Sequence, residues 1–391
     1  MEDEIPLQAK ACGSFLSTRM KILVFVGYFF PHKGGSENHI YEFVEKLSKY
    51  YQISVITINT NNVKNYEVVN KNFDIYRISG TQILGGTFPI FYLNKSFFET
   101  IRILKENKYD LIMTRTRFFL TSFLGMIFAK NNYLPLIHVE HGSSHTVLKN
   151  KFTEFFGIIY DHIIGYLIVN SAKLNIGISS GACTFLQHLG AKNIVKINRG
   201  INYDEIHKIR RKLRKTDEVK RLIFVGRLVY AKGVQDLLVA FSRLERKNLK
   251  LMIVGGGSYK SALKNIVDKL EINKSVSFKG ELDRIECLKL MSKSDIFINP
   301  SYSEGLPTSV LEAGALGMPV IATDVGGTKD IINPQTGILV SKKDICQLCN
   351  AINFMISNKK QRHKYQENIT QFIKSNFDWD KIIRKWKKIL R

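Results

Sequence analysis

Short apolar segments alternate with longer amphipathic ones along the whole chain. The short segments are rich in β-branched and aromatic residues, as buried strands are, and the longer ones have the apolar spacing of helices. This alternation predicts βαβ units, in which a parallel sheet is covered by helices on both faces. In the first half, the predicted strands are Ile22–Val26, Ile53–Ile58, Leu111–Thr114, Leu136–Val139 and Ile176–Ile178.

The alternation is interrupted once and then begins again. Residues 203–220 are polar and basic, as in a segment that connects two domains. A chain of 391 residues is long enough for two hydrophobic cores, so we expect two successive doubly wound domains with a cleft between them. Ligands of such sheets bind beyond the carboxyl ends of the strands. The second series of predicted strands is Leu222–Val225, Leu249–Val254, Val276–Phe278, Ile296–Ile298 and Val320–Ala322.

The most specific stretch of the sequence is 299–320, where a strand leads through a loop into a helix. Pro307 is expected near the first position of that helix, where a missing amide hydrogen has little cost. The backbone N–H groups of Thr308, Ser309 and Val310 would then be open at the helix N-terminus. Open N–H groups and the positive end of the helix dipole together suit a phosphate.

Two glutamates accompany this predicted helix start. Glu312 lies about one turn inside the helix, and its side chain leans back toward the N-terminus. Its carboxylate could accept two hydrogen bonds from a vicinal diol, such as a ribose, next to the phosphate. Glu304, in the preceding loop, is placed to meet a sugar.

A second candidate element, 224–233, follows the first strand of the second half. It contains two cations, Arg227 and Lys232, in one loop after a strand. A diphosphate leaving group needs fixed positive charge where negative charge develops, and two such cations supply it without a metal ion.

In the first half, the first strand leads into paired glycines, Gly34 and Gly35, and then into a helix. Paired glycines let the backbone approach a ligand closely, although an ordinary strand-to-helix turn would read the same way. The loop lacks the G-x-G-x-x-G pattern, which argues against a dinucleotide site.

A group of polar residues, His138, Glu140, His141 and His145, follows the strand Leu136–Val139. Three histidines raise the possibility of a zinc site. Their H-x2-H-x3-H spacing is not a familiar zinc pattern, however, and a Gly-Ser-Ser turn interrupts it. We therefore expect no metal there, and structural roles for His138 and His145.

The stretch 299–320 resembles the E-x7-E signature of glycosyltransferase family 4, with Glu304 and Glu312 as its two glutamates and the G-L-P and A-x-G-x-P-V words intact. The resemblance extends over nearly the whole chain from Met20. It implies an α/β fold of GT-B architecture, in which two Rossmann-like doubly wound domains face each other across a cleft. It also implies a retaining hexosyltransferase that uses a nucleotide-diphosphate sugar, with no metal or other cofactor.

The resemblance also implies roles for individual residues. Glu304 would contact the donor hexose, Glu312 the nucleotide ribose, and Arg227 and Lys232 the phosphates. His141 would lie beside the donor sugar, and Gly34 and Gly35 would line the donor and acceptor cleft. The residues implied to act in catalysis are Glu304, His141, Arg227 and Lys232, and those implied to bind the donor are Gly35, Arg227, Lys232, Glu304, Gly305, Leu306, Pro307, Thr308, Ser309, Val310 and Glu312.

Some short motifs of this sequence depart from the family pattern. Asp330 stands where the G-G-x-x-E turn usually has glutamate, and 198–202 changes both polar positions of the N-G-I-D word. The turn 255–257 is Gly-Gly-Gly where relatives have G-D-G, so recognition of the base could differ.

The expected domain boundary lies where the alternation of strand-like and helix-like segments is interrupted. Residues 1–19 are expected to be a disordered extension, 20–202 the acceptor domain and 203–376 the nucleotide-sugar-binding domain. The last segment, 377–391, resembles the family's closing helix, which crosses back to the first domain.

The net charge of +24 indicates a negatively charged binding partner. Phosphorylated small molecules, an anionic membrane surface and nucleic acid would each fit this charge, and the family resemblance argues against nucleic acid. Aromatic and basic residues occur together in 88–98, 118–128 and 152–168, which suits either core packing or peripheral contact with anionic lipid. Five scattered cysteines and the absence of a convincing signal sequence favour a cytoplasmic protein. Such a protein could also bind peripherally to the cytosolic face of the membrane.

Three other functions share parts of this pattern. A glycoside hydrolase would use paired glutamates but has no need of Arg227 and Lys232. A nucleotide-sugar epimerase would have the same architecture and need no acceptor. A non-catalytic nucleotide-sugar-binding protein would keep Lys232 and Glu312 without turnover. The function expected from the sequence is transfer of a hexose or N-acetylhexosamine to a glycan or lipid-linked acceptor.

Overall fold

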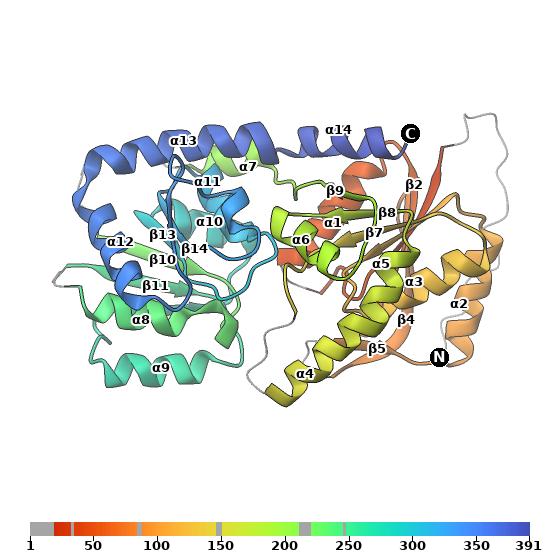
Figure 1. Ribbon diagram of the computed structural model, residues 1–391, viewed down its shortest axis with the longest axis horizontal. Coiled ribbons are helices and arrows are strands. Elements are labelled where there is room, and N and C mark those ends of the chain that lie inside the picture. The colour runs from red at the N-terminus through yellow and green to blue at the C-terminus, as the bar shows by residue number, and fades with distance from the viewer. Residues whose placement is uncertain (1–18, 33–34, 84–87, 146–150, 211–219, 245–247) are drawn as a thin grey trace. The chain divides into compact units, whose positions relative to one another are not determined.

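The structure, a computed structural model, describes residues 19–32, 35–83, 88–145, 151–210, 220–244 and 248–391, so the predicted extension and Gly34 lie outside the described residues. The chain divides into two compact units (Figure 1). Unit 1 comprises Met1–His141, Gly157–Gly177 and Cys183–Lys196, and unit 2 comprises Gly142–Phe156, Ile178–Ala182 and Ile197–Arg391.

Unit 1 is built on a nine-stranded sheet with the order β3-β4-β2-β1-β6-β7-β8-β9, in which β5 also pairs with β4. β3 and β5 run antiparallel to β4, whereas the other neighbouring strands are parallel. The strands are β1 (Lys21–Phe25), β2 (Gln52–Asn59), β3 (Tyr66–Asn70), β4 (Phe73–Ile83), β5 (Phe88–Phe91), β6 (Leu111–Arg115), β7 (Leu136–Glu140), β8 (Leu174–Gly177) and β9 (Ile194–Lys196).

Helices alternate with strands in the first half, as the sequence predicts, except from β2 to β5, where four strands follow one another without a helix. The aromatic segments contribute both to the core and to the surface: Phe97 and Phe128 are buried, whereas Phe98 and Tyr166 are exposed. The helices are α1 (Gly35–Leu47), α2 (Lys95–Glu106), α3 (Leu120–Asn131), α4 (Lys151–Tyr160), the π-helical turn η1 (Asp161–Gly165), α5 (Tyr166–Ser171) and α6 (Ser180–His188).

Unit 2 contains a six-stranded sheet, all parallel, in the order β12-β11-β10-β13-β14-β15. Its strands are β10 (Arg221–Val225), β11 (Lys250–Val254), β12 (Val276–Gly280), β13 (Ile296–Asn299), β14 (Val320–Thr323) and β15 (Ile338–Val340). Its helices and 3₁₀ turns are α7 (Tyr203–Ile209), η2 (Tyr230–Lys232), α8 (Val234–Ser242), α9 (Lys260–Lys269), α10 (Arg284–Ser292), α11 (Thr308–Ala315), η3 (Thr328–Asp330), α12 (Ile345–Ser357), α13 (Lys359–Phe377) and α14 (Trp379–Ile389).

Each of the ten predicted strands is present within two residues of its expected bounds. The segment 203–220 differs from its prediction, because its first part forms the helix α7. Tyr203 and Ile206 are buried there, so a short apolar stripe holds this turn of helix within an otherwise polar stretch.

The core of unit 2 brings two loops together. Leu222 and Phe224 of β10 pack with α8 and α12 on one face of the sheet, while Ile223 is buried on the other. Apolar residues on both faces are typical of a parallel sheet between helix layers. β10 and β13 are neighbours in this sheet, so their carboxyl ends meet at one edge. The loops after these strands carry Lys232 and Glu304.

Polar residues fix where several helices begin. Asp283 accepts a hydrogen bond from the backbone of Glu286 at the start of α10, and Asp344 accepts one from Gln347 at the start of α12. Each side chain satisfies a backbone donor that the helix itself leaves open. The structure therefore defines the first residue of α10, which is Arg284, by a specific contact.

Within the described residues, a search for helices with the length and apolar character needed to cross a lipid bilayer finds none. Cys183, Cys287, Cys346 and Cys349 are free thiols.

Candidate active site

The loop after β13 holds Glu304 in a buried polar setting. Three donors converge on one carboxylate oxygen: the Lys232 ammonium and the Ser301 hydroxyl each lie 2.6 Å from Oε1, and the Asn299 amide lies 3.4 Å away. Burial works against the charge of Glu304, but Lys232 and these hydrogen bonds outweigh it, so the pKa of Glu304 is lowered. Glu304 is therefore ionised at neutral pH, and all three contacts use the same oxygen.

A glycine allows Lys232 to approach this loop. Gly233, which follows Lys232, has a φ of +64°, and a Cβ atom built on it would lie 2.0 Å from the Pro300 carbonyl oxygen. A residue with a side chain would be strained in this conformation and would also collide with the loop. Gly233 thus brings η2 into close contact with the segment that carries Glu304.

Arg227, the other predicted cation, differs from Lys232 in its surroundings. Its side chain is exposed to solvent, and no ion pair joins it to another residue in the part of the chain that the structure describes. The backbone around it is fixed by the next loop, because Leu228 donates a backbone hydrogen bond of 2.6 Å to Gly256. Arg227 thus combines a fixed backbone with a guanidinium that lies in solvent.

The helix predicted after the E-x7 loop is α11, and it begins at Thr308 with Pro307 in the capping position. Pro307 therefore precedes the first helical residue instead of occupying it. The Arg199 guanidinium donates a hydrogen bond to the Thr308 hydroxyl, so a second cation from within unit 2 lies at this helix start. Gly305, Leu306, Ser309 and Val310 surround this start in the chain, and Leu306 and Val310 are buried.

Glu312 lies inside α11, as predicted, but no feature of the sequence indicates its partner. The Arg284 Nε atom, at the first position of α10, donates a hydrogen bond of 3.0 Å to Glu312 Oε1. Both side chains keep partial exposure, 28% for Arg284 and 11% for Glu312. An arginine that directly follows a helix cap is common, so nothing in its spacing indicates this pairing.

The G-G turn after β14 contacts the Glu304 loop directly. Gly326 has a φ of +54°, and a Cβ atom built on it would lie 1.6 Å from the Glu304 carbonyl oxygen. The same carbonyl oxygen accepts a hydrogen bond of 2.5 Å from the Ser143 hydroxyl. Asp330, where the family usually has glutamate, accepts a hydrogen bond of 2.5 Å from the backbone N–H of Ser180. Asp330 therefore supports the start of α6.

In unit 1, the residues after β7 separate into two groups. His138 and Glu140 point into the interior, where His138 lies 2.9 Å from the Thr114 hydroxyl and 3.3 Å from Glu140. His141 instead contacts Arg115, which ends the neighbouring strand β6. The predicted structural role of His138 fits its complete burial. His138 and His141 thus contact different protein groups and do not point at a common position.

A buried charge cluster lies beside these histidines. Arg117 pairs with Glu140 at 3.0 Å and with Asp161 at 2.8 Å, and all three side chains are at most 3% exposed. Burial opposes the charge of Arg117, but the two carboxylates outweigh it and raise the pKa of this guanidinium. This cluster joins β7 to the π-helical turn η1 and fixes the end of the strand from which His141 extends.

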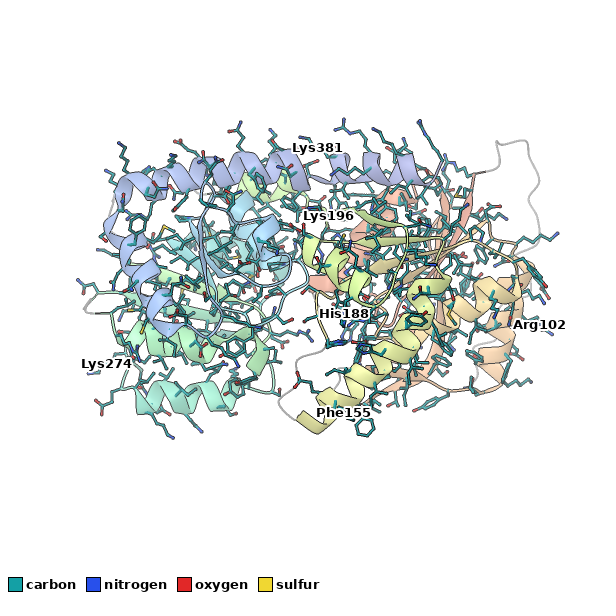
Figure 2. All side chains as sticks on the ribbon, in the orientation of Figure 1. Arg102, Phe155, His188, Lys196, Lys274 and Lys381 are labelled. Carbon is teal, nitrogen blue, oxygen red and sulfur yellow. The ribbon has the colours of Figure 1, made fainter. Side chains whose placement is uncertain are left out.

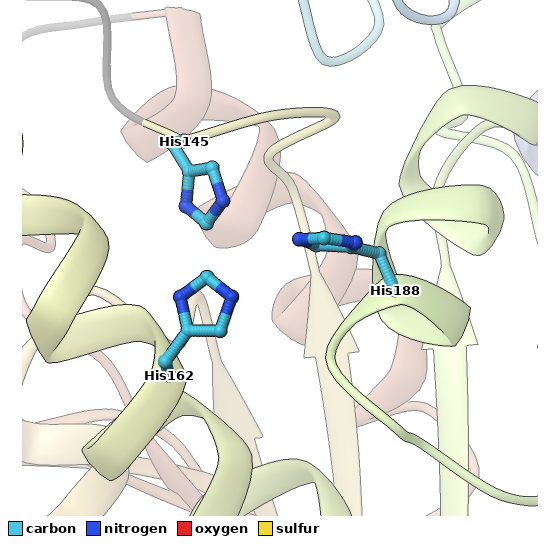
Figure 3. A group of neighbouring side chains, drawn as sticks. All are labelled: His145, His162 and His188. Carbon is cyan, nitrogen blue, oxygen red and sulfur yellow. The ribbon is translucent and has the colours of Figure 1, made fainter.

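Two further imidazoles lie close together in unit 1. The rings of His162 on η1 and His188 on α6 have centroids 5.5 Å apart in an edge-to-face arrangement (Figure 3). Both residues are exposed. Such a contact helps to hold η1 against α6, because aromatic rings favour this geometry.

Comparison with known proteins identifies the family of the chain. The family model described as "Glycosyltransferase Family 4" matches residues 33–205, and the model "Glycosyl transferases group 1" matches residues 205–372. The uncharacterized glycosyltransferase MJ1069 of Methanocaldococcus jannaschii is 33% identical over 387 residues, which cover 95% of this chain and 98% of that protein. The alpha-monoglucosyldiacylglycerol synthase of Streptococcus pneumoniae is 27% identical over 346 residues, or 83% of this chain and 74% of that protein.

Solved structures show the same fold. Sucrose-phosphate synthase from Thermosynechococcus elongatus matches with a TM-score of 0.77 and 20% identity, covering 95% of this chain and 98% of that one. Anabaena HepE in complex with UDP-glucose matches with a TM-score of 0.75 and 19% identity, covering 95% and 99%. The predicted GT-B class, with two Rossmann-like α/β domains, is confirmed. The chain belongs to glycosyltransferase family 4.

Proposed function

We propose that this glycosyltransferase transfers a hexose or N-acetylhexosamine from a nucleotide-diphosphate sugar and retains the configuration of the anomeric carbon. The observation that carries the proposal is the Lys232–Glu304 contact, which joins the two predicted donor-binding loops within unit 2. A lysine ammonium has three hydrogens to donate, so Lys232 can keep Glu304 and still bind a phosphate oxygen. Glu304 uses only Oε1 in its contacts with described residues, so Oε2 is the oxygen proposed to accept from a sugar hydroxyl.

The diphosphate is proposed to bind Lys232 and Arg227 at the start of α11. Arg227 is exposed and thus available to a ligand, and both cations would stabilise the negative charge that develops on the leaving group. The ribose is proposed to contact Glu312, whose orientation the Arg284 hydrogen bond fixes. A donor of this class also fits the neighbours, since HepE was solved with UDP-glucose.

The transfer itself needs no protein nucleophile in this proposal. The bond between the anomeric carbon and the β-phosphate oxygen breaks, and the acceptor hydroxyl oxygen forms the new bond on the same face of the sugar. The acceptor's proton passes to the leaving diphosphate. Glu304 and the two cations contribute orientation and charge stabilisation, while His141 is proposed, by the family resemblance, to act beside the donor sugar.

The acceptor is proposed to be a glycan or a lipid-linked molecule at an anionic membrane surface. One exposed face of α2 carries Lys95, Phe98, Arg102 and Lys105, at the spacing of a helical stripe, and Figure 2 labels Arg102 on this helix. Phe98 is 61% exposed. A stripe that combines an aromatic ring with cations suits the interface of a membrane with anionic lipids.

Liposome sedimentation tests the membrane part of this proposal. The protein should pellet with phosphatidylglycerol vesicles at low salt and not with phosphatidylcholine vesicles. Arg102→Glu on α2 should weaken binding clearly more than Lys274→Glu, a matched charge reversal on an exposed residue of unit 2 (Figure 2). Equal effects of the two variants, or no binding to anionic vesicles, would remove the membrane from the proposal.

The transfer reaction is tested by incubating the protein with a panel of nucleotide sugars, with and without membrane lipid extract. Free nucleoside diphosphate that appears only with acceptor, together with a product that keeps the donor's anomeric configuration by NMR, is the expected result. Sugar interconversion without acceptor would identify an epimerase, and tight binding without turnover would identify a binding protein. Hydrolysis of glycosides without any nucleotide donor would identify a glycoside hydrolase.

A further inference from the structure

His141 and Arg115 are brought together by the sheet of unit 1. Arg115 ends β6 and His141 directly follows β7, and these strands are parallel neighbours with Arg115 opposite Val139. Two atoms of the guanidinium point at a single ring nitrogen: Nε lies 3.2 Å and Nη2 lies 2.8 Å from His141 Nε2. The contact is therefore a fork directed at one atom.

This geometry fixes where the proton of the imidazole lies. An arginine guanidinium has only N–H donors and no acceptor, and it stays charged in proteins. The Nε2 atom of His141 must consequently accept, so it cannot carry a hydrogen. A neutral imidazole with Nε2 as acceptor has its one hydrogen on Nδ1.

The surroundings hold Arg115 rigidly in this position. Its side chain is 2% exposed, and its guanidinium lies over the ring of Phe43 on α1, 4.7 Å from the ring centroid. Its backbone carbonyl oxygen accepts a hydrogen bond of 3.0 Å from the Ser122 hydroxyl. A buried, stacked guanidinium loses little freedom when it forms the fork, which favours a single arrangement.

Charges near the imidazole also favour its neutral form. Protonation of Nε2 would place a second positive charge against Arg115, where burial limits screening by water. Two titratable groups of unit 1 near the imidazole are His39 on α1, whose ring centroid is 6.4 Å from that of His141, and Glu140, which precedes His141 in the chain. Glu140 already pairs with Arg117 at 3.0 Å, so its charge is engaged within the other cluster.

We propose that Arg115 is a positioning residue that locks His141 as the neutral tautomer with its hydrogen on Nδ1. The lone pair of Nε2 is then engaged by Arg115 and Nδ1 carries the hydrogen, so His141 cannot be the base that receives the proton of the acceptor hydroxyl. Any hydrogen bond that the ring gives to a sugar comes from Nδ1. The catalytic consequence rests on the proposed function, whereas the tautomer rests only on the geometry of unit 1.

NMR of the full chain labelled with ¹⁵N-histidine, without donor, tests the tautomer directly. The resonances of His141 are identified by their loss in His141→Gln. We expect one protonated nitrogen, Nδ1, and one unprotonated nitrogen, Nε2, with the same pattern from about pH 5 to pH 8. A hydrogen on Nε2, a mixture of tautomers, or a ring that titrates in this range would overturn the proposal.

Substitutions of Arg115 give a second test. Arg115→Met should release the ring, so that His141 shows tautomer exchange and titrates, and Arg115→Lys should restore part of the wild-type pattern through one remaining donor. Arg77→Met is the matched control, because Arg77 is also a 2% exposed arginine of unit 1 but contacts Glu67 instead. The His141 resonances should keep the wild-type pattern in Arg77→Met. If both methionine variants change the pattern equally, the effect is general loosening and the assignment to Arg115 is wrong.

The NMR result and the transfer assay can fail separately. Wild-type transfer activity in His141→Gln would show that His141 takes no part in the proposed reaction. The tautomer would still be decided separately, by the His141 resonances of the unsubstituted protein. With both proposals correct, Arg115→Met lowers kcat at least several-fold and Arg115→Lys recovers part of it.

Discussion

A charge cluster of unit 1 and two ion pairs of unit 2 differ in how far their cations are exposed to solvent. In unit 1, Arg117, Glu140 and Asp161 form a cluster in which no side chain is more than 3% exposed. In unit 2, Lys232–Glu304 and Arg284–Glu312 each join a carboxylate that is at most 11% exposed to a cation that is 23% or 28% exposed. The unit 2 cations can therefore reach solvent, whereas the unit 1 cation is enclosed by protein.

This difference separates structural charges from charges that a ligand can use. A fully buried ion cluster cannot exchange partners without exposing a charge to an apolar interior, so it serves to fix neighbouring elements. A partly exposed ammonium or guanidinium can add a phosphate or hydroxyl to its contacts at little cost. The comparison predicts that substitutions in the Arg117 cluster act mainly on stability and those of Lys232 and Glu312 mainly on the reaction.

The largest expected effect is that of Arg117→Met. This change leaves two carboxylates buried without their cation, and we expect the free energy of unfolding to fall by about 3–5 kcal/mol. Urea denaturation followed by circular dichroism measures it. Arg284→Met in unit 2 is the control, because loss of a partly exposed pair costs about 1 kcal/mol or less. Similar losses in the two variants would contradict the distinction between the units.

Next in size are Lys232→Ala and Glu312→Gln, which are predicted to impair transfer. Each removes one proposed donor contact, and we expect a loss of about 2 kcal/mol or more in transition-state stabilisation, roughly 30-fold in kcat/KM. Steady-state release of nucleoside diphosphate measures the rate, and thermal melting confirms that the variants are folded. Unchanged turnover in both would break the assignment of the donor site to unit 2.

The sequence predicted ten parallel strands but missed β4, which lies inside the sheet and pairs in parallel with β2, and it also missed β3, β5, β9 and β15. Strands such as Ile296–Asn299 are buried on both faces and therefore read as continuous apolar runs. The antiparallel strand Tyr66–Asn70 lies at a sheet edge with a half-exposed, polar pattern, and nothing in its periodicity distinguishes it from a loop. Short strands such as β9 and β15, of three residues each, give too little pattern to detect.

For the candidate site, local sequence indicated candidate residues but not their partners. Glu304, Lys232 and Glu312 belong to recognisable words, and the sheet order then brings Lys232 and Glu304 together. Arg284 and Arg115 belong to no such sequence motif. Their contacts with Glu312 and His141 depend on side chains that meet across different elements, and a single sequence carries no signal for such pairs.

The lowered pKa of Glu304 gives a smaller, pH-dependent prediction. Its ordinary value is 4.5, and the folded value is lower, so the carboxylate stabilises the fold at pH values above 4.5. That contribution should disappear as the pH falls through the lower folded value. The difference in unfolding free energy between wild type and Glu304→Gln should therefore be constant from neutral pH to about pH 5 and shrink below about pH 4. A difference that grows on acidification would show that Glu304 is not held as a carboxylate.

The smallest expected effect concerns the helix that carries Arg284. Asp283 caps α10 through a hydrogen bond of 2.8 Å from the Glu286 backbone, and Asp344 caps α12 in the same way with a 2.8 Å bond from Gln347. Asp283→Ala and Asp344→Ala should each cost about 1 kcal/mol of stability, because each removes one side-chain cap. Only α10 positions the guanidinium on Glu312, so only Asp283→Ala should also weaken nucleoside diphosphate binding, by a few-fold in calorimetry. If Asp344→Ala weakens binding equally, the effect comes from general loosening of unit 2, and Arg284 has no special role in holding Glu312, the carboxylate proposed to bind the ribose.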